Sequence, residues 1–370
     1  MLIIIAVAKF FLGIIYAFMK LRHVERKVVF LSRQGNEPSV DYARLAAALE
    51  SEGVSTEMHL QRQEKDSARF MKNAGGNLRT ILRQMRALAT ARVAVTDGYS
   101  IPVSVLNHRR ELTVVQIWHA AGAVKKFGLQ TMSAMDEREM KRALALKMHE
   151  GYDWFAAPSE ATARFFAEAF GMGMGSALIT GTPYLDALLD GAFGRQGDIL
   201  RAYPELAENE RSGHPRKVVL YVPTFRAGGE ADEAARSLRG ALDPARYILI
   251  EKNHPIADES PAGFLAEELI FAADAVVTDY SSLAFAAAHI GKPLFFYLYD
   301  IEEYSASPGL NVDPEREYGK YSARDAAELA GMLAEPYDAE YERRFARRYI
   351  TAERGRCTES LIEKILSMLA

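Results

Sequence analysis

DAVVTDYSSLAFAAAHIGKPLFFYLYD, residues 274–300, contains a complete strand–helix–strand unit and decides the fold of this chain. Residues 275–278 and 292–299 are apolar runs of strand type, and the alanine-rich residues 283–290 between them have the length of a short helix. Two strands that are joined by a helix run parallel when they share a sheet. The segment therefore predicts an α/β protein with a parallel sheet.

A polar turn of Asp279, Tyr280, Ser281 and Ser282 falls where the first of these strands meets the helix. The first turn of a helix offers backbone N–H groups and the positive end of the helix dipole, and the two serine hydroxyls add further donors. We expect this turn to bind an anion. The alternative is that Asp279 or Ser281 serves only as the N-cap of the helix.

The composition is that of an ordinary globular protein. The chain has 370 residues, enough for two domains, of which 49% are hydrophobic and 25% charged. A net charge of -4 argues against a nucleic-acid-binding protein, which is usually basic over a whole domain. The single cysteine, Cys357, cannot form an internal disulfide and falls in a predicted C-terminal helix, so we interpret it as a helix residue in a reducing compartment.

An apolar segment precedes the first predicted domain. Residues 2–19 are apolar apart from Lys9 and Tyr16. Basic residues follow at once: Lys20, Arg22, His23, Arg26 and Lys27. As a helix the run would be about 27 Å long, close to the thickness of a bilayer core. We predict that residues 1–22 form a monotopic membrane anchor on the cytoplasmic side, with a buried N-terminal helix as the alternative.

Alternating strands and helices predict a first Rossmann-like domain over residues 23–195. The predicted strands are residues 28–31, 92–96, 113–118, 154–157 and 178–180, and helices are predicted at residues 41–50, at residues 67–91 and from about residue 159. Arginines gather on one face of the 67–91 segment. We interpret that face as solvated, with a second contact to the membrane surface as the alternative.

His119 comes directly after the predicted strand at residues 113–118, and Lys125 and Lys126 follow a loop of small residues. Strand ends are where open α/β sheets place ligand groups. Small residues let a ligand approach the backbone, and paired cations suit phosphate. We predict a functional role for His119, because a neutral imidazole can accept a proton near pH 7. A structural histidine is the alternative.

A second Rossmann-like domain is predicted over residues 213–335. Residues 191–215 are polar, rich in Gly and Pro, and without a clear apolar period, so we place the domain boundary there. Predicted strands at residues 217–222 and 247–250 end in polar turns. With the turn at residues 279–282, three strand ends then carry polar groups on one edge: Thr224, Arg226, Lys252, His254, Asp279, Ser281 and Ser282. Such a set describes a diphosphate site.

Five motifs in fixed order resemble those of the CDP-glycerol glycerophosphotransferases of teichoic acid synthesis. They are QIWHAAGAVKKFGL (116–129), TGTPYLDAL (180–188), YVPTFR (221–226), KNHP (252–255) and VTDYSSLAF with GKPLFFYLYDIEEY (277–304). The resemblance covers about residues 92–304, and the wording is most similar to that of the family's wall teichoic acid glycerol primases.

The resemblance implies a glycosyltransferase-B fold, with two Rossmann-like domains facing across a cleft and C-terminal helices, residues 336–370, returning to the first domain. It implies that the first domain serves the acceptor and the second the nucleotide donor. Glycerol phosphate would pass from CDP-glycerol to a hydroxyl of an undecaprenyl-diphosphate-linked disaccharide at the membrane, and CMP would leave. No tightly bound metal or cofactor is expected; a loosely held divalent cation on the diphosphate is compatible with this chemistry.

Carried onto this chain, the resemblance makes His119 the general base and gives His254 a catalytic role in the second domain. The implied donor-binding residues are Thr224, Arg226, Lys252, Asp279, Ser281, Ser282, Lys125 and Lys126. The chain departs from the usual wording at Ala120, where many members have Gly, and at Tyr184 and Leu185, where an Arg-Asn pair is common. The second change removes a cation near the acceptor side.

Three alternatives stay open. The first is a polymerising glycerol- or ribitol-phosphate transferase of the same family. The second is an enzyme of the same fold that acts on a sugar nucleotide. The third is a non-catalytic member that holds lipid-linked glycan for partners. A homo-oligomer and contacts with other teichoic acid enzymes are compatible with all of them.

Overall fold

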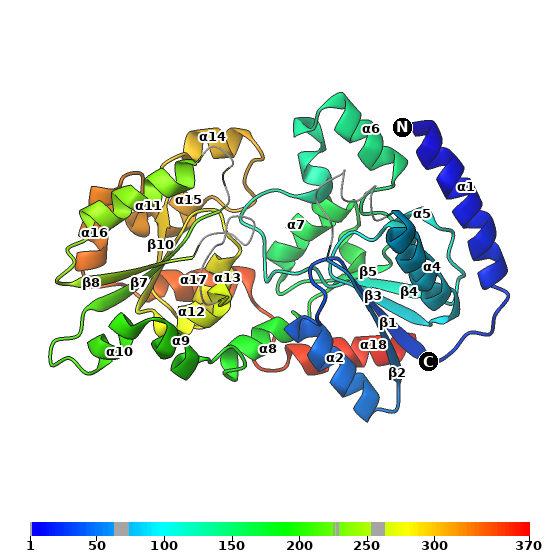
Figure 1. Ribbon diagram of the computed structural model, residues 1–370, viewed down its shortest axis with the longest axis horizontal. Helices are drawn as coiled ribbons and strands as arrows, with labels where there is room; N and C mark the ends of the chain where they lie inside the picture. The colour runs from blue at the N-terminus through cyan, green and yellow to red at the C-terminus, as the bar shows by residue number, and fades with distance from the viewer. Residues whose placement is uncertain (1, 63–73, 225, 227–228, 253–262) are drawn as a thin grey trace. The chain divides into compact units, whose positions relative to one another are not determined.

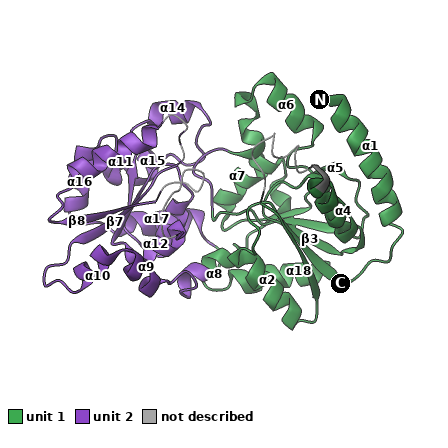
Figure 2. Cartoon of the chain, viewed as in Figure 1, with its two compact units in different colours: residues 1–121, 127–186, 352–370 green, residues 122–126, 187–351 purple. Residues whose placement is uncertain are grey.

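The computed structural model describes residues 2–62, 74–224, 226, 229–252 and 263–370. The chain divides into two compact units (Figure 2). The first comprises residues 1–121, 127–186 and 352–370, and the second comprises residues 122–126 and 187–351. Each unit is built on a parallel sheet, as the sequence predicts.

The sheet of the first unit has six parallel strands in the order β2-β1-β3-β4-β5-β6. They are β1 Lys27–Ser32, β2 Ser55–Leu60, β3 Val93–Thr96, β4 Thr113–Gln116, β5 Trp154–Ala156 and β6 Ala177–Leu178. All six residues of β1 are buried, as expected of a parallel strand that is covered on both faces. Successive side chains of the strand point to opposite faces of the sheet and so pack into two separate cores.

Helices cover both faces of this sheet (Figure 1). On one face α2 (Val40–Ser51) and α18 (Cys357–Met368) pack against Val28 and Phe30. On the other face α1 (Leu2–Met19) and α4 (Ala74–Thr90) pack with Val29 and Leu31. The remaining helices of the unit are α5 Ile101–Val105, η1 Gly128–Ala134, α6 Glu137–Ala145, α7 Glu160–Phe170 and η2 Met174–Ser176, and α8 Pro183–Leu189 leads into the second unit.

The sheet of the second unit has five strands in the order β11-β10-β9-β7-β8. They are β7 Lys217–Val222, β8 Tyr247–Glu251, β9 Ala275–Thr278, β10 Leu294–Tyr297 and β11 Ser322–Ala323. Its helices are α9 Gln196–Ala202, α10 Pro204–Glu210, α11 Glu230–Ala241, α12 Ala266–Ala272, α13 Leu283–His289, α14 Ile301–Ala306, α15 Pro314–Tyr318, η3 Gly319–Tyr321, α16 Ala326–Ala334 and α17 Glu340–Tyr349.

The strand–helix–strand unit that opens the sequence argument is confirmed. β9, α13 and β10 follow one another, and β9 and β10 pair in parallel with Val276 opposite Leu294. All seven residues of α13 are buried. Its alanines leave room for α17, which packs against α13 within the second unit.

Two regions differ from the sequence-based expectation. Residues 191–215, where the sequence shows no clear apolar period and where we placed the domain boundary, contain α9 and α10, whose Ile199 and Leu206 are buried. Each helix has only seven residues, too few to show an apolar period. The division between the compact units also falls earlier than expected, after Asp186. The C-terminal helices, which were expected to return together to the first domain, are divided: α18 lies in the first unit and α17 in the second.

The aspartate of the TGTPYLD motif explains how α18 is fixed to the first unit. Asp186 is buried and accepts hydrogen bonds from the backbone N–H of Cys357 and of Thr358, at 3.1 and 2.7 Å. These N–H groups open α18 and have no partner within the helix. Cys357 is therefore a buried helix residue, as predicted, and burial raises the pKa of its thiol to about 12.

Candidate functional site

The imidazole of His119 lies just beyond the carboxyl end of β4 and is exposed. Its Nδ1 atom is 2.9 Å from the main-chain carbonyl oxygen of Asp97 and 3.2 Å from the side-chain amide nitrogen of Gln34. A carbonyl oxygen only accepts hydrogen bonds and an amide nitrogen only donates them, so the two contacts require opposite states of Nδ1. The shorter contact, to the carbonyl oxygen, favours the tautomer with the hydrogen on Nδ1 and the lone pair on Nε2. This is the tautomer that a general base requires at Nε2.

The backbone leading into His119 is strained. Trp118 has φ of 55°, a left-handed conformation that costs a non-glycine residue about 1 to 2 kcal/mol. Its N–H donates to Oε1 of Gln116 at 2.9 Å, and Nε2 of Gln116 donates to the carbonyl of Gly98 at 3.2 Å. One fully buried side chain thus ties the turn after β4 to the turn after β3. Strain that is held in this way is a common property of functional sites.

Aromatic rings support this turn from the side. The Trp118 ring stacks on Phe127 with centroids 4.5 Å apart, and Phe170 meets it edge-on. His149 also borders the Trp118 ring. Burial, and then the nearby His119, lower the pKa of His149 to about 4, so this second histidine is neutral near pH 7. The sequence analysis did not select His149, because only the fold brings it to this turn.

Asp97, whose main-chain carbonyl contacts His119, also has a buried carboxyl group. Its Oδ2 accepts from the Ser32 hydroxyl at 2.6 Å, while its Oδ1 has no hydrogen-bond partner among the described residues. Burial raises the pKa of Asp97 to about 7. The sequence places this residue at a strand end but does not reveal its burial, which is why it was not selected as a site residue.

In the second unit the turn after β9 encloses Asp279 completely. Its carboxylate accepts from the Thr224 N–H at 2.9 and 3.0 Å, from the Thr224 hydroxyl at 2.6 Å and from the Tyr280 N–H at 2.6 Å. Burial raises the pKa of Asp279, while Arg226 and these donors oppose the rise. The carboxylate therefore joins the turn after β9 to the turn after β7.

Arg226 is held over this turn by two carboxylates. Its Nε donates to Asp300 at 2.7 Å and its Nη2 to Asp279 at 3.3 Å. The guanidinium also lies over the ring of Tyr304, 4.4 Å from the centroid. Burial lowers the pKa of Arg226, but the hydrogen bond to Asp300 and the charge of Asp279 outweigh it, so the side chain stays cationic.

Lys125 belongs to the second unit, not to the first domain in which the sequence analysis places it. The backbone of this segment is pinned there: Lys126 N–H donates to Gly309 O at 2.9 Å, and the Asn311 side chain donates to Lys125 O at 3.1 Å. Burial lowers the pKa of Lys125, Asp279 raises it and Arg226 lowers it. The ammonium group is thus within electrostatic reach of the Asp279 turn.

The small-residue loop has a packing role. A Cβ atom on Gly122 would lie 2.3 Å from the ring of Phe285, so only glycine fits. We expected these small residues to admit a ligand to the backbone. Gly122 instead admits a buried aromatic ring of the same unit.

The remaining predicted residues of the second unit are placed as follows. Ser281 accepts from the Leu283 N–H at 3.2 Å through its hydroxyl, so it takes part in capping α13, and the structure shows no side-chain cap bond for Ser282. Both serines are half-buried, and Lys252 is buried at the end of β8. His254 lies outside the described residues.

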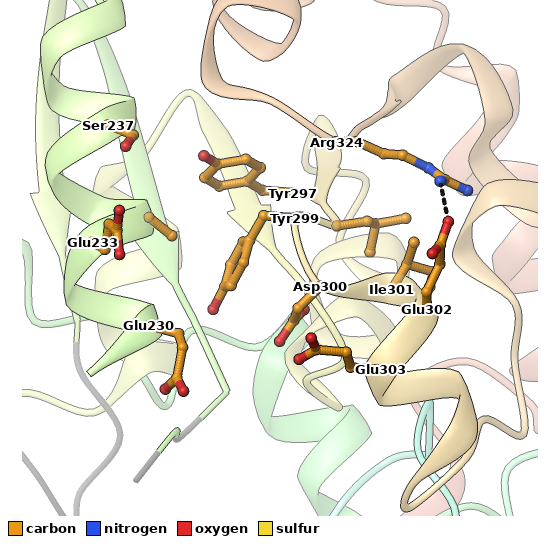
Figure 3. A pocket seen from close by; sticks show the side chains of 12 residues that line it. Glu230, Glu233, Ser237, Tyr297, Tyr299, Asp300, Ile301, Glu302, Glu303 and Arg324 are labelled. Atoms are coloured by element: carbon orange, nitrogen blue, oxygen red, sulfur yellow. Dashed lines mark hydrogen bonds and ion pairs between the residues drawn. The ribbon is translucent and has the colours of Figure 1, made fainter. Parts of the chain in front are cut away.

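A cavity of about 570 Å³ borders Asp300 on the second unit (Figure 3). The charged residues of its lining are mainly acidic, with Glu230, Glu233, Glu302 and Glu303 beside Asp300, and its Arg324 is paired with Glu302 at 3.2 Å. This lining does not suit a phosphate group. Over the described part of the chain, His, Cys, Asp and Glu side chains form no cluster of three or more that could hold a metal ion.

Comparison with known families identifies the chain. The family described as CDP-Glycerol:Poly(glycerophosphate) glycerophosphotransferase matches residues 15–367. A teichoic acid ribitol-phosphate primase of Bacillus spizizenii is 28% identical over 304 residues, covering 76% of each chain. A teichoic acid glycerol-phosphate primase of Bacillus subtilis is 25% identical over 315 residues, covering 78% of this chain and 77% of the relative.

Solved structures show the same fold. The wall teichoic acid polymerase TagF superposes with a TM-score of 0.66 at 18% identity, covering 96% of this chain and 92% of that chain. The UDP-GlcNAc 2-epimerase of Neisseria meningitidis superposes with a TM-score of 0.58 at 13% identity, covering 92% of this chain and 100% of that chain. These likenesses agree with the glycosyltransferase-B fold that the sequence analysis predicts.

Proposed function

Because the chain belongs to the CDP-glycerol glycerophosphotransferase family of teichoic acid synthesis, we propose that it carries out a priming step at the cytoplasmic face of the membrane. In this step, glycerol phosphate passes from CDP-glycerol to the hydroxyl of a lipid-linked disaccharide, and CMP leaves. The names of the relatives support priming. Two Bacillus glycerol-phosphate primases are 25% and 26% identical to this chain, which covers 77% and 76% of their length.

The observation that carries the mechanism is the hydrogen bond from His119 Nδ1 to the Asp97 carbonyl. With Nδ1 protonated, Nε2 accepts the proton of the acceptor hydroxyl while the hydroxyl oxygen attacks the glycerol-bearing phosphorus. The bond from that phosphorus to the oxygen it shares with the cytidine-bearing phosphate breaks, and CMP departs with the bonding electron pair. Phosphoryl transfer of this kind depends mainly on positioning and on charge stabilisation.

On the donor side we assign the diphosphate to Lys125, Arg226 and the serine turn, with Lys126, Lys252 and His254 completing the set. Lys125 and Arg226 offer positive charge in one unit. Ser281 and Ser282 offer hydroxyls that are half-buried rather than enclosed. Asp279 and Thr224 orient these groups, because both side chains are buried and bonded to each other.

A second candidate is priming with ribitol phosphate. A ribitol-phosphate primase matches this chain with slightly higher identity than the glycerol-phosphate primase of Bacillus subtilis, 28% against 25%. The departures at Ala120, Tyr184 and Leu185 concern the acceptor side and do not distinguish the two donors. An assay with CDP-glycerol and CDP-ribitol in turn separates the two candidates.

The test is one incubation of the purified protein with CDP-glycerol or CDP-ribitol and a lipid-linked disaccharide analogue, followed by mass measurement of the product. A single added glycerol phosphate with CMP supports the proposal. A ladder of additions would identify a polymerase, and product from CDP-ribitol alone would identify the second candidate. In a parallel incubation with a sugar nucleotide, release of a nucleoside diphosphate would identify a glycosyltransferase. No CMP with any acceptor would overturn the proposal.

A further inference from the structure

The N-terminal helix α1 lies along the first unit instead of projecting from it (Figure 1). The residues of its less exposed stripe recur at helical spacing: Ile5, Lys9, Leu12, Tyr16 and Met19. Tyr16 is 1% exposed and its hydroxyl is 2.8 Å from Nδ1 of His108. Leu12 and Met19 pack against the same core as Tyr16. α1 is therefore part of the folded unit.

Lys9 has a partner in this arrangement. Its ammonium group donates to the carbonyl oxygen of Ala145, at the end of α6, at 2.8 Å. By length and composition α1 could cross a bilayer. A crossing helix would have to leave Lys9 and Tyr16 without these partners, at high cost in hydrocarbon. The observed contacts favour a helix that stays on the protein with its axis along the membrane surface.

The opposite face of α1 is a continuous apolar surface. Its exposed side chains are Leu2, Ile3, Ile4, Val7, Phe10, Phe11, Ile14, Ile15 and Phe18, with Leu21 directly after the helix. Ile3 is 79% exposed and Phe18 is 70% exposed. Large contiguous apolar patches on a folded protein mark an interaction site.

A basic pocket lies at the C-terminal end of the same helix. It has a volume of about 580 Å³, and its lining includes Lys20, Arg22, His23 and Arg109, with a single carboxylate, Glu111. The pocket is built on fixed backbone. Arg109 donates to the carbonyls of Lys20 and Arg22, and the Lys20 ammonium donates to the Asn107 carbonyl at 2.8 Å.

We infer that α1 is an in-plane membrane anchor and that this pocket takes the phosphate of an anionic lipid headgroup. The apolar face would enter the outer hydrocarbon of the leaflet, as amphipathic interfacial helices do. Cations just beyond such a helix lie at headgroup depth, where each adds about 1 kcal/mol of attraction to an anionic surface. The charge of the pocket and the apolar face beside it match one occupant, the surface of an anionic bilayer.

The inference goes beyond the transfer reaction and is tested without it. The full-length protein is floated with vesicles of phosphatidylcholine, alone or mixed with phosphatidylglycerol. Phe10→Ser combined with Phe18→Ser should weaken binding to both vesicles by at least about tenfold, since two phenyl rings lose their burial. Arg22→Gln should weaken binding about fivefold, and only to the anionic vesicles. The matched control is Leu265→Ser, a similarly exposed apolar residue of the second unit, which should change neither.

Three results would overturn the inference. Vesicle binding that survives the double phenylalanine change would show that α1 is not the anchor. A wild-type dimer that this change converts to monomers, without loss of vesicle binding, would assign the apolar face to a second copy. Equal loss on both vesicle types for Arg22→Gln would exclude the headgroup pocket. Thermal melting checks that each variant folds, and turnover of a water-soluble acceptor analogue should be unchanged, which separates failure here from failure of the proposed reaction.

Discussion

The turn after β4 and the turn after β9 each follow the carboxyl end of a central strand, one in each sheet. They use their polar residues in opposite ways. His119 is exposed, and its imidazole rests on a main-chain carbonyl. Asp279 is 0% exposed, and protein donors surround its carboxylate. In the first turn the backbone holds a titratable side chain out toward solvent. In the second turn the titratable side chain is itself what holds the backbone together. The residue type in a sequence motif does not distinguish these two roles.

The two turns also differ in what holds them. The His119 turn depends on neutral hydrogen bonds of Gln116 and on a strained Trp118 backbone. The Asp279 turn depends on a buried charge that is balanced by Arg226. Neutral bonds cost little to rearrange, whereas an unbalanced buried charge is expensive. Substitutions should therefore damage activity in the first turn and stability in the second.

The largest expected effect is on stability. Asp279→Ala removes one carboxylate partner of Arg226 and leaves the N–H groups of Thr224 and Tyr280 without their acceptor. Breaking a buried ion pair in this way costs about 3 to 5 kcal/mol, which denaturant unfolding would measure. Asp198→Ala, which breaks two exposed pairs, with Arg195 and Arg201, is the control and should cost about 1 kcal/mol or less. A fully stable Asp279→Ala variant that loses only donor binding would make Asp279 a ligand contact.

The next effect is on rate. His119→Ala should lower turnover by about a hundredfold or more, since general-base catalysis contributes at least that much. CMP release from CDP-glycerol measures it, and the melting temperature should stay close to that of the wild type because the imidazole is exposed. His214→Ala, an exposed histidine of the second unit, should leave turnover unchanged. Near-normal turnover of His119→Ala would remove it from the mechanism.

The sequence predicts the parts of this molecule whose signals are local. β9, α13 and β10 are found because an apolar run, a polar turn and an alanine-rich helix follow one another within residues 274–300. β7 is found because its apolar run is uninterrupted. His119 is found because it directly follows a strand. Each of these signals lies within a few residues of the feature it predicts.

The parts that the sequence does not predict depend on distant neighbours. β2 reads Ser-Thr-Glu-Met-His-Leu, an edge strand with too little apolar character to be recognised alone. The segment at residues 122–126 joins the second unit through Gly309 and Asn311, far along the chain. Asp97 and His149 owe their shifted pKa values to burial, which only the folded unit creates. No local pattern encodes these properties.

A third effect is the pH dependence of stability, which tests the protonation state of Asp97 in the His119 turn. The pKa of Asp97 is about 7 in the folded protein, against an ordinary value of 3.8. The folded state thus holds this proton more tightly than the unfolded state, so the contribution to stability is full below pH 3.8 and is lost as the pH rises to about 7. Asp97→Asn has no such titration. Between pH 5 and pH 8 the wild type should lose about 2 kcal/mol more of its unfolding free energy than the variant.

Thermal or denaturant unfolding of both proteins at the two pH values checks this. Asp198→Asn, on the exposed face of α9, is the control for the effect of an Asp-to-Asn change itself. A difference between wild type and Asp97→Asn that does not change with pH would show that Asp97 is ionised throughout. The interpretation that neutral groups hold the His119 turn would then be wrong.

The smallest effect concerns the two serines of the Asp279 turn, Ser281 and Ser282, which are only half-buried. Ser281→Ala combined with Ser282→Ala removes two hydroxyls at the opening of α13, and each hydrogen bond to the donor is worth about 1 kcal/mol. The apparent KM for CDP-glycerol should rise by roughly thirtyfold with little change in kcat, since the hydroxyls bind ground state and transition state alike. Ser237→Ala, beside the acidic cavity, should leave KM unchanged. An unchanged KM in the double variant, together with a small loss of stability from the missing bond to the Leu283 N–H, would give the turn after β9 a purely structural role and leave the binding of CDP-glycerol to Lys125 and Arg226.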